Sequence, residues 1–183
     1  LGVKKVFLNT FHLSKQIFEF IKKKNFSIDI QIISDGEMIL DTGGGILNMI
    51  NNSKENDFLV LNPDTLWNEE YVSEVNKMQS FYFLKKINCI LLMANKALSF
   101  DKSLKGDFSI KDNLLKKDDN KNFIYIGCQI LNRNIFSKYD INTFSITQVW
   151  NELLDKNELY GFESFNKFYH LTNFETFKKL QDL

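Results

Sequence analysis

Residues 57–67 read DFLVLNPDTLW, and this stretch is the clearest indication of the fold in the sequence. Its first part, 57–62, is a short and continuous apolar run, which is typical of a parallel strand buried on both faces of a sheet. The single proline of the chain, Pro63, then ends the strand. Asp64 follows at the carboxyl end of the strand, which is where open α/β sheets bind their ligands.

Strand and helix patterns alternate on both sides of this stretch. Apolar spacing predicts strands at 3–9 and 27–34, with a helix over 12–25 between them. Downstream, a helical pattern at 69–86 precedes a strongly apolar strand at 87–94. This order predicts an α/β fold, with a Rossmann-like and mostly parallel sheet flanked by helices.

The pattern changes in the second half of the chain. A small β-hairpin is predicted within 104–118, with Asp112 and Asn113 in its turn, and 121–133 follows as another buried strand. The remaining predicted elements are a helix over 145–157 capped by Ser145 or Thr143, short strands at 159–162 and 167–171, and a closing helix capped by Asn173. We expect residues 1–183 to form one single domain.

Composition excludes several classes of function. Lysine and arginine together number 23, as do aspartate and glutamate, so the formal net charge is zero and favours neither nucleic acid nor a membrane surface as a partner. The two cysteines, Cys89 and Cys128, lie far apart in apolar runs and are expected to be buried free thiols. No apolar run reaches transmembrane length and no signal peptide is seen. We therefore expect a cytoplasmic protein.

Residues 40–50, LDTGGGILNMI, place three consecutive glycines just before an apolar helical stretch. Glycine loses more backbone entropy on folding than any other residue, so something must require the bare backbone here. One explanation is a nucleotide base or a phosphate that lies on this backbone at a helix N-terminus. The other is a glycine turn that only packs a helix against a strand. The residues alone leave both open.

Other positions carry weaker signals. One carboxylate after a strand, as at Asp64, commonly holds magnesium and through it phosphate oxygens, although a turn aspartate that bonds its own backbone has the same pattern. Gly106 and Asp107 precede the predicted hairpin, as many simple turns do. Gly127 interrupts an apolar strand, which indicates close approach of a ligand or of another backbone. His170 lies among aromatic residues, where a structural role is common.

Taken in order, these segments resemble the sugar-1-phosphate nucleotidyltransferase family. The likeness is strongest to its short bacterial forms, such as mannose-1-phosphate guanylyltransferases and N-acetylmuramate-1-phosphate uridylyltransferases. Those forms carry LxTGGG, NxDxxW, GDF, a Y/F-x-G-x-x-I/V-L strand and a C-terminal L-F/Y-G…W-x-H/D-x-G-T. The matching segments here are LDTGGG, LNPDTLW, GDFSI, YIGCQIL and LYGFESFNKFYHLTN, and they extend from residue 3 to the C-terminus.

The resemblance implies a reaction and a set of roles. A sugar-1-phosphate oxygen would attack the α-phosphorus of a nucleoside triphosphate in line, giving an NDP-sugar and pyrophosphate, with Mg²⁺ as cofactor. Asp64 would be the catalytic, metal-binding aspartate, and His170 stands where the family has its second metal aspartate. The implied binding residues are Thr42, Gly43, Gly44 and Gly45 for the nucleotide and Gly106, Asp107 and Gly127 for the sugar.

The sequence also departs from the family. The N-terminal G-x-G-x-R signature and the Pro-Lys that follows it are missing, because the chain starts at the family's second strand. We therefore expect a fold that lacks its first βα unit, an enzyme incomplete as this chain alone, and either self-association or a partner that supplies the missing strand. The alternative is a non-catalytic remnant, or a nucleotide- or sugar-binding module. This alternative is favoured by Phe168 in place of the family's Trp and by Thr172-Asn173 in place of its Gly-Thr.

Overall fold

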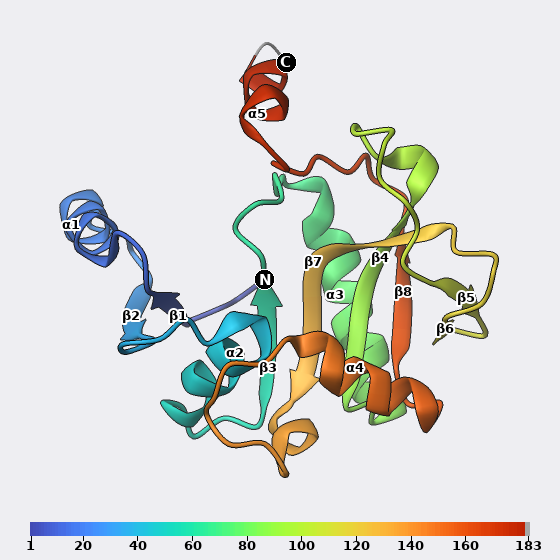
Figure 1. Ribbon diagram of the computed structural model, residues 1–183, viewed down its shortest axis with the longest axis horizontal. Helices are drawn as coiled ribbons and strands as arrows, with labels where there is room; N and C mark the ends of the chain where they lie inside the picture. The colour runs from blue at the N-terminus through green and yellow to red at the C-terminus, as the bar shows by residue number, and fades with distance from the viewer. Residues whose placement is uncertain (182–183) are drawn as a thin grey trace. The chain divides into compact units, whose positions relative to one another are not determined.

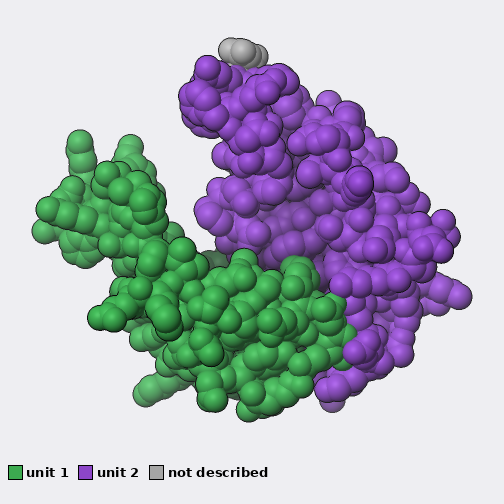
Figure 2. Space-filling model, in the orientation of Figure 1, with its two compact units in different colours: residues 1–58, 133–152 green, residues 59–132, 153–183 purple. Residues whose placement is uncertain are grey.

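The computed structural model describes residues 1–181, which divide into two compact units (Figure 2). Unit 1 contains residues 1–58 and 133–152, and unit 2 contains residues 59–132 together with the described residues from 153 onward. No helix in the described part of the chain has the length and apolarity that crossing a membrane requires.

Unit 1 begins with a β-α-β arrangement (Figure 1). Strands β1 (Lys5–Thr10) and β2 (Asp29–Ser34) pair in parallel, and helix α1 (Ser14–Lys24) connects them. Both strands and the helix were predicted and are confirmed. Three lysines fill the last turn of α1, where the helix dipole favours positive charge, yet no residue of α1 is buried.

Helix α2 (Asp41–Asn51) follows in unit 1 and contains the three glycines. The sequence placed the three glycines just before the helix, and this boundary was wrong, because Gly43, Gly44 and Gly45 all lie inside the first turns of α2 and are buried. Asp41 begins the helix with a φ of 57°, in the left-handed region. The three glycines therefore lie in the packed interior of unit 1, where other segments approach the helix closely.

Unit 2 is built on a six-stranded sheet with the order β3-β7-β4-β8-β6-β5, whose first strand begins two residues before the unit. Its strands are β3 (Asp57–Leu61), β4 (Cys89–Asn95), β5 (Ser109–Lys111), β6 (Leu114–Lys116), β7 (Phe123–Asn132) and β8 (Tyr160–Ser164). The helices are α3 (Glu70–Lys85) and α5 (Phe174–Gln181), with α4 (Ile146–Asp155) shared between the units, and short 3-10 turns at Lys96–Leu98 and Arg133–Phe136.

The sheet is mixed in direction. Central strand β4 runs parallel to β8 and antiparallel to β7, and β5 and β6 form the predicted hairpin. Asp112 and Asn113 both have positive φ in its turn, which confirms them as the turn residues. A central sheet flanked by helices confirms the predicted α/β class (Figure 1).

The core of unit 2 lies between α3 and one face of this sheet. Strands β4 and β7 each send alternate residues to that face, as the period of two in a strand requires. Burying one such side chain contributes roughly 1.5–3 kcal/mol. Cys89 and Cys128 are free and buried, as predicted. The core consists of Tyr71, Val75, Met78, Tyr82, Ile87, Ile90, Leu92, Ala94, Ile124, Ile126, Cys128, Ile130 and Phe168.

Candidate functional site

The three glycines of α2 have a packing explanation within unit 1. A Cβ on Gly43 would overlap the ring of Phe144, and a Cβ on Gly44 would overlap the carbonyl oxygen of Asn142. The amides of Gly43 and Gly44 also donate to the Phe144 carbonyl, at 2.9 and 3.2 Å. The start of α2 thus uses these two N–H groups within the chain. This is the packing role that the sequence left open beside ligand contact.

Thr42 takes part in the same close packing. Its hydroxyl accepts a hydrogen bond from the Ile146 amide at 3.0 Å, which satisfies one of the free N–H groups at the start of α4. The Thr143 hydroxyl donates to the Ile39 carbonyl at 2.7 Å. Ser145, predicted as a cap of this helix, accepts from the Thr147 amide at 3.3 Å and is confirmed. Thr42 therefore has a structural role whether or not a nucleotide contacts it.

A polar cluster beside Gly45 was not predicted from the sequence. Asn9, near the end of β1, donates to Asp35 Oδ2 at 2.9 Å, and Asn48 of α2 donates to Asp35 Oδ1 at 3.2 Å. A Cβ on Gly45 would stand 2.8 Å from the Asn9 side-chain nitrogen. The signal was present, because Asn9 and Asp35 both come where a strand ends and the two strands pair in parallel.

Asp64 and His170 meet in unit 2. His170 Nε2 lies 3.0 Å from Asp64 Oδ2, and the ring of His170 stacks on that of Phe168, with 5.7 Å between the centroids. The strand predicted at 167–171 does not form as an element, but its residues make an isolated antiparallel bridge between Thr65 and His170. The sequence patterns placed these two residues on separate elements, and only the resemblance joined them.

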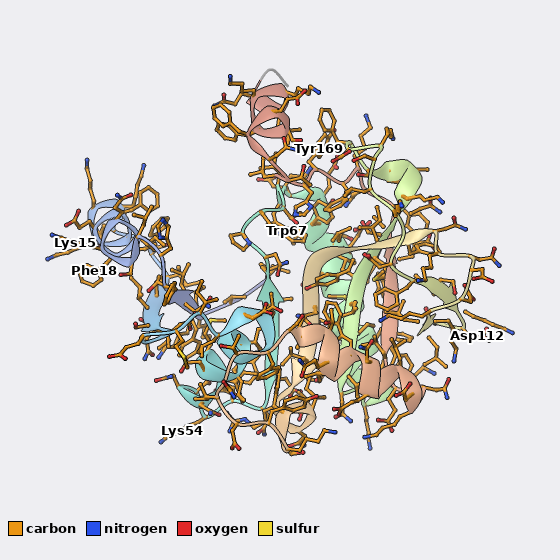
Figure 3. The ribbon with its side chains drawn as sticks, in the orientation of Figure 1. Lys15, Phe18, Lys54, Trp67, Asp112 and Tyr169 are labelled. Carbon is orange, nitrogen blue, oxygen red and sulfur yellow. The ribbon has the colours of Figure 1, made fainter. Side chains whose placement is uncertain are left out.

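Backbone hydrogen bonds fix this pair in place. The Leu171 amide donates to the Asp64 carbonyl at 2.8 Å, and the Leu66 amide donates to the Tyr169 carbonyl at 3.0 Å. Figure 3 labels Trp67 and Tyr169, which stand on these two neighbouring segments of unit 2. The indole N–H of Trp67 bonds back to the Asn62 carbonyl at 3.1 Å and closes the turn that carries Asp64.

Gly127 supports the same turn from strand β7. Its φ is +84°, and a Cβ there would lie 2.9 Å from both Asn62 Cβ and Thr65 Oγ1. The Asn62 amide donates to the Gly127 carbonyl at 2.7 Å, and the Thr65 hydroxyl donates to the Ile126 carbonyl at 2.9 Å. The close approach predicted at Gly127 is made by the side chains of Asn62 and Thr65, which belong to the turn that holds Asp64.

Gly106 and Asp107 lie where the chain approaches the start of β7. A Cβ on Gly106 would overlap the Lys121 carbonyl, and Asp107 Oδ2 accepts from the Tyr125 amide at 3.0 Å. Desolvation raises the pKa of the Asp107 carboxyl, although the hydrogen bond from Tyr125 opposes that rise. Asp107 is therefore tied to β7 two residues before Gly127.

One oxygen of Asp64 is left in an unusual state. Asp64 Oδ1 is buried and has no hydrogen-bond partner within residues 1–181. The Asp64 side chain as a whole is 48% exposed, so a ligand from solvent can reach the carboxylate and bond this oxygen. Burial raises the pKa of the Tyr125 phenol well above its usual value, and the nearby Asp64 carboxylate adds to the rise.

The donor set fits a cation that is completed by a substrate. Among the described residues, no group of three or more His, Cys, Asp or Glu side chains is placed to hold a metal ion. Asp64 supplies a carboxylate 3.0 Å from His170 Nε2, and Mg²⁺ is commonly bound through one or two carboxylates, with water and phosphate oxygens filling the rest. Asp64 is therefore the residue that would hold such an ion, with His170 beside it.

Comparison with known proteins establishes the fold of the chain. The sequence matches no protein-family model and no curated protein. Among solved structures, HddC from Yersinia pseudotuberculosis complexed with GMP-PN aligns over 97% of this chain and 77% of its own, with a TM-score of 0.76 and 19% identity. A UDP-glucose pyrophosphorylase complexed with UDP-glucose aligns over 99% and 80%, with a TM-score of 0.76 and 16% identity.

The inositol-1-phosphate CTP transferase from T. maritima is a third similar structure, with a TM-score of 0.69, 12% identity and coverage of 89% of this chain and 68% of its own. At these identities the likeness establishes the architecture of the chain. The fold is that of the sugar-1-phosphate nucleotidyltransferases, as the resemblance implied.

Proposed function

We propose that the chain is a sugar-1-phosphate nucleotidyltransferase, which transfers a nucleotidyl group from a nucleoside triphosphate to a sugar-1-phosphate and releases pyrophosphate. The observation that carries the proposal is the 3.0 Å contact between Asp64, on the turn after β3, and His170 on the segment bridged to that turn, with Asp64 Oδ1 shielded from solvent and without a partner among the described residues. The fold supports it, because this turn follows the carboxyl end of a strand in an α/β sheet.

Each predicted site residue keeps its role as part of this proposal. Asp64 and His170 would hold the divalent cation, expected to be Mg²⁺, which neutralises phosphate charge when bound. Asp64 holds and orients the reacting groups, since phosphoryl-group chemistry depends on positioning more than on acid–base catalysis. The nucleotide would lie against Thr42, Gly43, Gly44 and Gly45, and the sugar against Gly106, Asp107 and Gly127.

The finer substrate assignment is also a proposal. The LDTGGG form resembles the guanylyl and uridylyl branches, so we propose mannose-1-phosphate guanylyltransferase-like chemistry in the cytoplasm, where Cys89 and Cys128 would stay free. Bringing each of the four nucleoside triphosphates together with mannose-1-phosphate, glucose-1-phosphate or N-acetylmuramate-1-phosphate identifies the productive pair. The measurement is the new diphosphate signal in ³¹P NMR.

The test of the function is pyrophosphate release in the presence of Mg²⁺. Asp64→Asn keeps the shape of the side chain and removes its charge, so we expect turnover to fall at least about a hundredfold, or roughly 3 kcal/mol of transition-state stabilisation. Asp119→Asn is the matched control, because Asp119 is an exposed carboxylate in a loop, and it should keep full activity. Full activity in Asp64→Asn would contradict the proposal.

A binding module without catalysis is the second candidate. Thr172 and Asn173 stand where the family has Gly-Thr, and here Asn173 caps α5 by accepting from the Thr176 amide at 2.8 Å. These residues have a structural use that does not need a substrate. Calorimetry separates the candidates, since a binding module would bind nucleotide in the presence of Mg²⁺ without releasing pyrophosphate, and a decayed remnant would do neither.

We also propose that a further strand, from a partner or a second copy of the chain, pairs with β1. Within residues 1–181, β1 pairs only with β2, so its other edge presents backbone groups that a strand can bond. Sedimentation velocity across a concentration series tests self-association. Self-association predicts a sedimentation coefficient that rises with concentration, and a monodisperse monomer throughout would contradict it.

A further inference from the structure

Residues 165–169, which connect the end of β8 to His170 in the described part of the chain, form no helix or strand. The place of His170 beside Asp64 therefore depends on side chains that hold this connection. We infer that Glu74 of α3 is a positioning residue for the site, because it fixes the direction in which the chain leaves β8. The inference rests on the proposed function, since it concerns how the same site is assembled.

Both oxygens of the Glu74 carboxylate accept a hydrogen bond from the end of β8. The Ser164 hydroxyl donates to Glu74 Oε2 at 2.5 Å, and the Phe165 amide donates to Glu74 Oε1 at 2.9 Å. Hydrogen bonds to a carboxylate are roughly twice as strong as those between neutral groups. Ser164 is fully buried, and its hydroxyl also accepts from the Asn166 amide at 3.3 Å. The first two residues after β8 therefore both depend on the Glu74–Ser164 pair.

Tyr71 holds the same connection from the preceding turn of α3. Its hydroxyl donates to the Lys167 carbonyl at 2.8 Å. Residues three apart lie on one face of a helix, so Tyr71 and Glu74 contact the connection together. Burial raises the pKa of the Tyr71 phenol and the nearby Glu74 carboxylate adds to the rise, so the hydroxyl stays a donor. Because Tyr71 belongs to the core of unit 2, α3 is a fixed support.

The contacts nearer to His170 are isolated and follow from this support. Phe168 makes a single parallel bridge with Ser99, and His170 makes a single antiparallel bridge with Thr65. A continuous ladder along 167–171, which would fix the path by itself, does not form. The side chains of α3 supply what that ladder would have supplied. Phosphoryl-group chemistry is sensitive to such support, because a misplacement of about 1 Å can cost about a hundredfold in rate.

Amide hydrogen exchange measures the positioning without any substrate. The Leu171 and Leu66 amides donate to the Asp64 and Tyr169 carbonyls, so their exchange reports how firmly the two segments are held together. In Glu74→Ala we expect both amides to exchange at least about tenfold faster relative to the amides of β4. The reference to β4 separates this local effect from a loss of overall stability, which would accelerate β4 as well.

Three further variants sharpen the measurement. Glu69→Ala is the matched control, because Glu69 is an exposed carboxylate at the start of α3, and it should leave the ratio unchanged. Glu74→Gln keeps an oxygen acceptor and should retain most of the protection. Ser164→Ala removes the hydroxyl that Glu74 binds and should reproduce part of the acceleration, so the test stays decisive if Glu74→Ala does not fold.

Pyrophosphate release links the positioning to the reaction. Glu74→Ala should lower kcat about tenfold with little change in KM, because Glu74 is not among the residues proposed to bind either substrate. Glu69→Ala should keep full turnover. Glu74→Gln should recover most of the lost rate, which a role in overall folding alone would not require.

The outcomes separate this inference from the proposed function. Equal acceleration at Leu66, Leu171 and the β4 amides would overturn the inference, as would native turnover in Glu74→Ala. Failure of the proposed function has a different signature. The native chain would then release no pyrophosphate, while Leu66 and Leu171 still lose their protection selectively in Glu74→Ala.

Discussion

Helix α1 of unit 1 and strand β4 of unit 2 both carry large apolar side chains, but in opposite environments. Phe18 and Phe20 of α1 are 54% and 53% exposed, and Figure 3 shows Phe18 projecting from the helix. In β4 the residues from Cys89 to Ala94 are all buried. The comparison teaches that periodicity shows which face of an element is apolar, whereas burial depends on whether another element covers that face.

The largest expected difference concerns the loss of one apolar side chain from each region. Leu92→Ala in β4 removes a fully buried side chain from the α3-facing core and should lower the free energy of unfolding by about 2–5 kcal/mol. Phe18→Ala in α1 should change it by less than about 0.5 kcal/mol. Urea denaturation of both variants measures the difference. Equal losses would show that α1 is covered in solution.

The glycines of α2 extend the comparison to a second helix of unit 1, one that is closely packed, unlike α1. Gly44→Ala places a methyl group on the Asn142 carbonyl, which is backbone and cannot move aside, and should cost about 2–3 kcal/mol. In Gly45→Ala the new methyl group clashes only with the Asn9 side chain. The better helix propensity of alanine offsets up to about 1 kcal/mol of the cost of that clash. Thermal unfolding compares them. A Gly44→Ala variant as stable as Gly45→Ala would disprove the packing role.

The buried thiols of unit 2 predict a loss of stability at high pH. Burial raises the pKa of Cys128 to about 12 and raises that of Cys89 as well, so both stay protonated when folded and ionise when the chain unfolds. Stability is therefore fully present below the unfolded pKa, near 8.5, and falls as pH rises toward 12. At pH 10 we expect a loss of about 1–2 kcal/mol per thiol.

The control for this prediction is the Cys89→Ala, Cys128→Ala double variant, compared over the same pH series. Its overall stability will be lower, but its loss between pH 8 and pH 10 should be smaller than that of the native chain. An identical slope in the two proteins would mean that the thiols are not the groups that titrate on unfolding.

The smallest effect is expected at the surface of unit 1. Lys5 and Asp29 are paired across β1 and β2 with their charged atoms 3.8 Å apart, and both side chains are largely exposed. Because water and salt screen such a pair, Lys5→Ala should change stability by at most about 0.5 kcal/mol. A loss above about 1 kcal/mol, measured by urea denaturation at low salt, would show that β1 is less exposed than its pairing indicates.

The strands were predictable because their sequences are continuous apolar runs. β3, β4 and β7 lie within one to two residues of their predicted bounds, and the β5–β6 turn followed from Asp112 and Asn113. Helix α2 was misjudged at its start, since glycine has low helix propensity and the Phe144 carbonyl that satisfies its amides is remote in sequence.

The candidate site was predictable in its residues and not in its geometry. Periodicity placed Asp64 after a strand, but only the resemblance connected it to His170, because side-chain pairing between remote segments has no local signal. The cluster of Asn9, Asp35 and Asn48 was missed although Asn9 and Asp35 stand at the ends of predicted strands, where a site was to be expected. Gly127 was recognised as a place of close approach, and the structure shows that the approaching group is the turn of Asp64.

The most direct test of the account is where a divalent cation binds. Amide spectra of the ¹⁵N-labelled chain, recorded with substoichiometric Mn²⁺, report its position through paramagnetic broadening. The account predicts that residues 64–66 and 169–171 broaden first and that Asp64→Asn abolishes this pattern. Broadening that spares both segments, or that spreads evenly over exposed carboxylates such as Asp118 and Asp119, would contradict it.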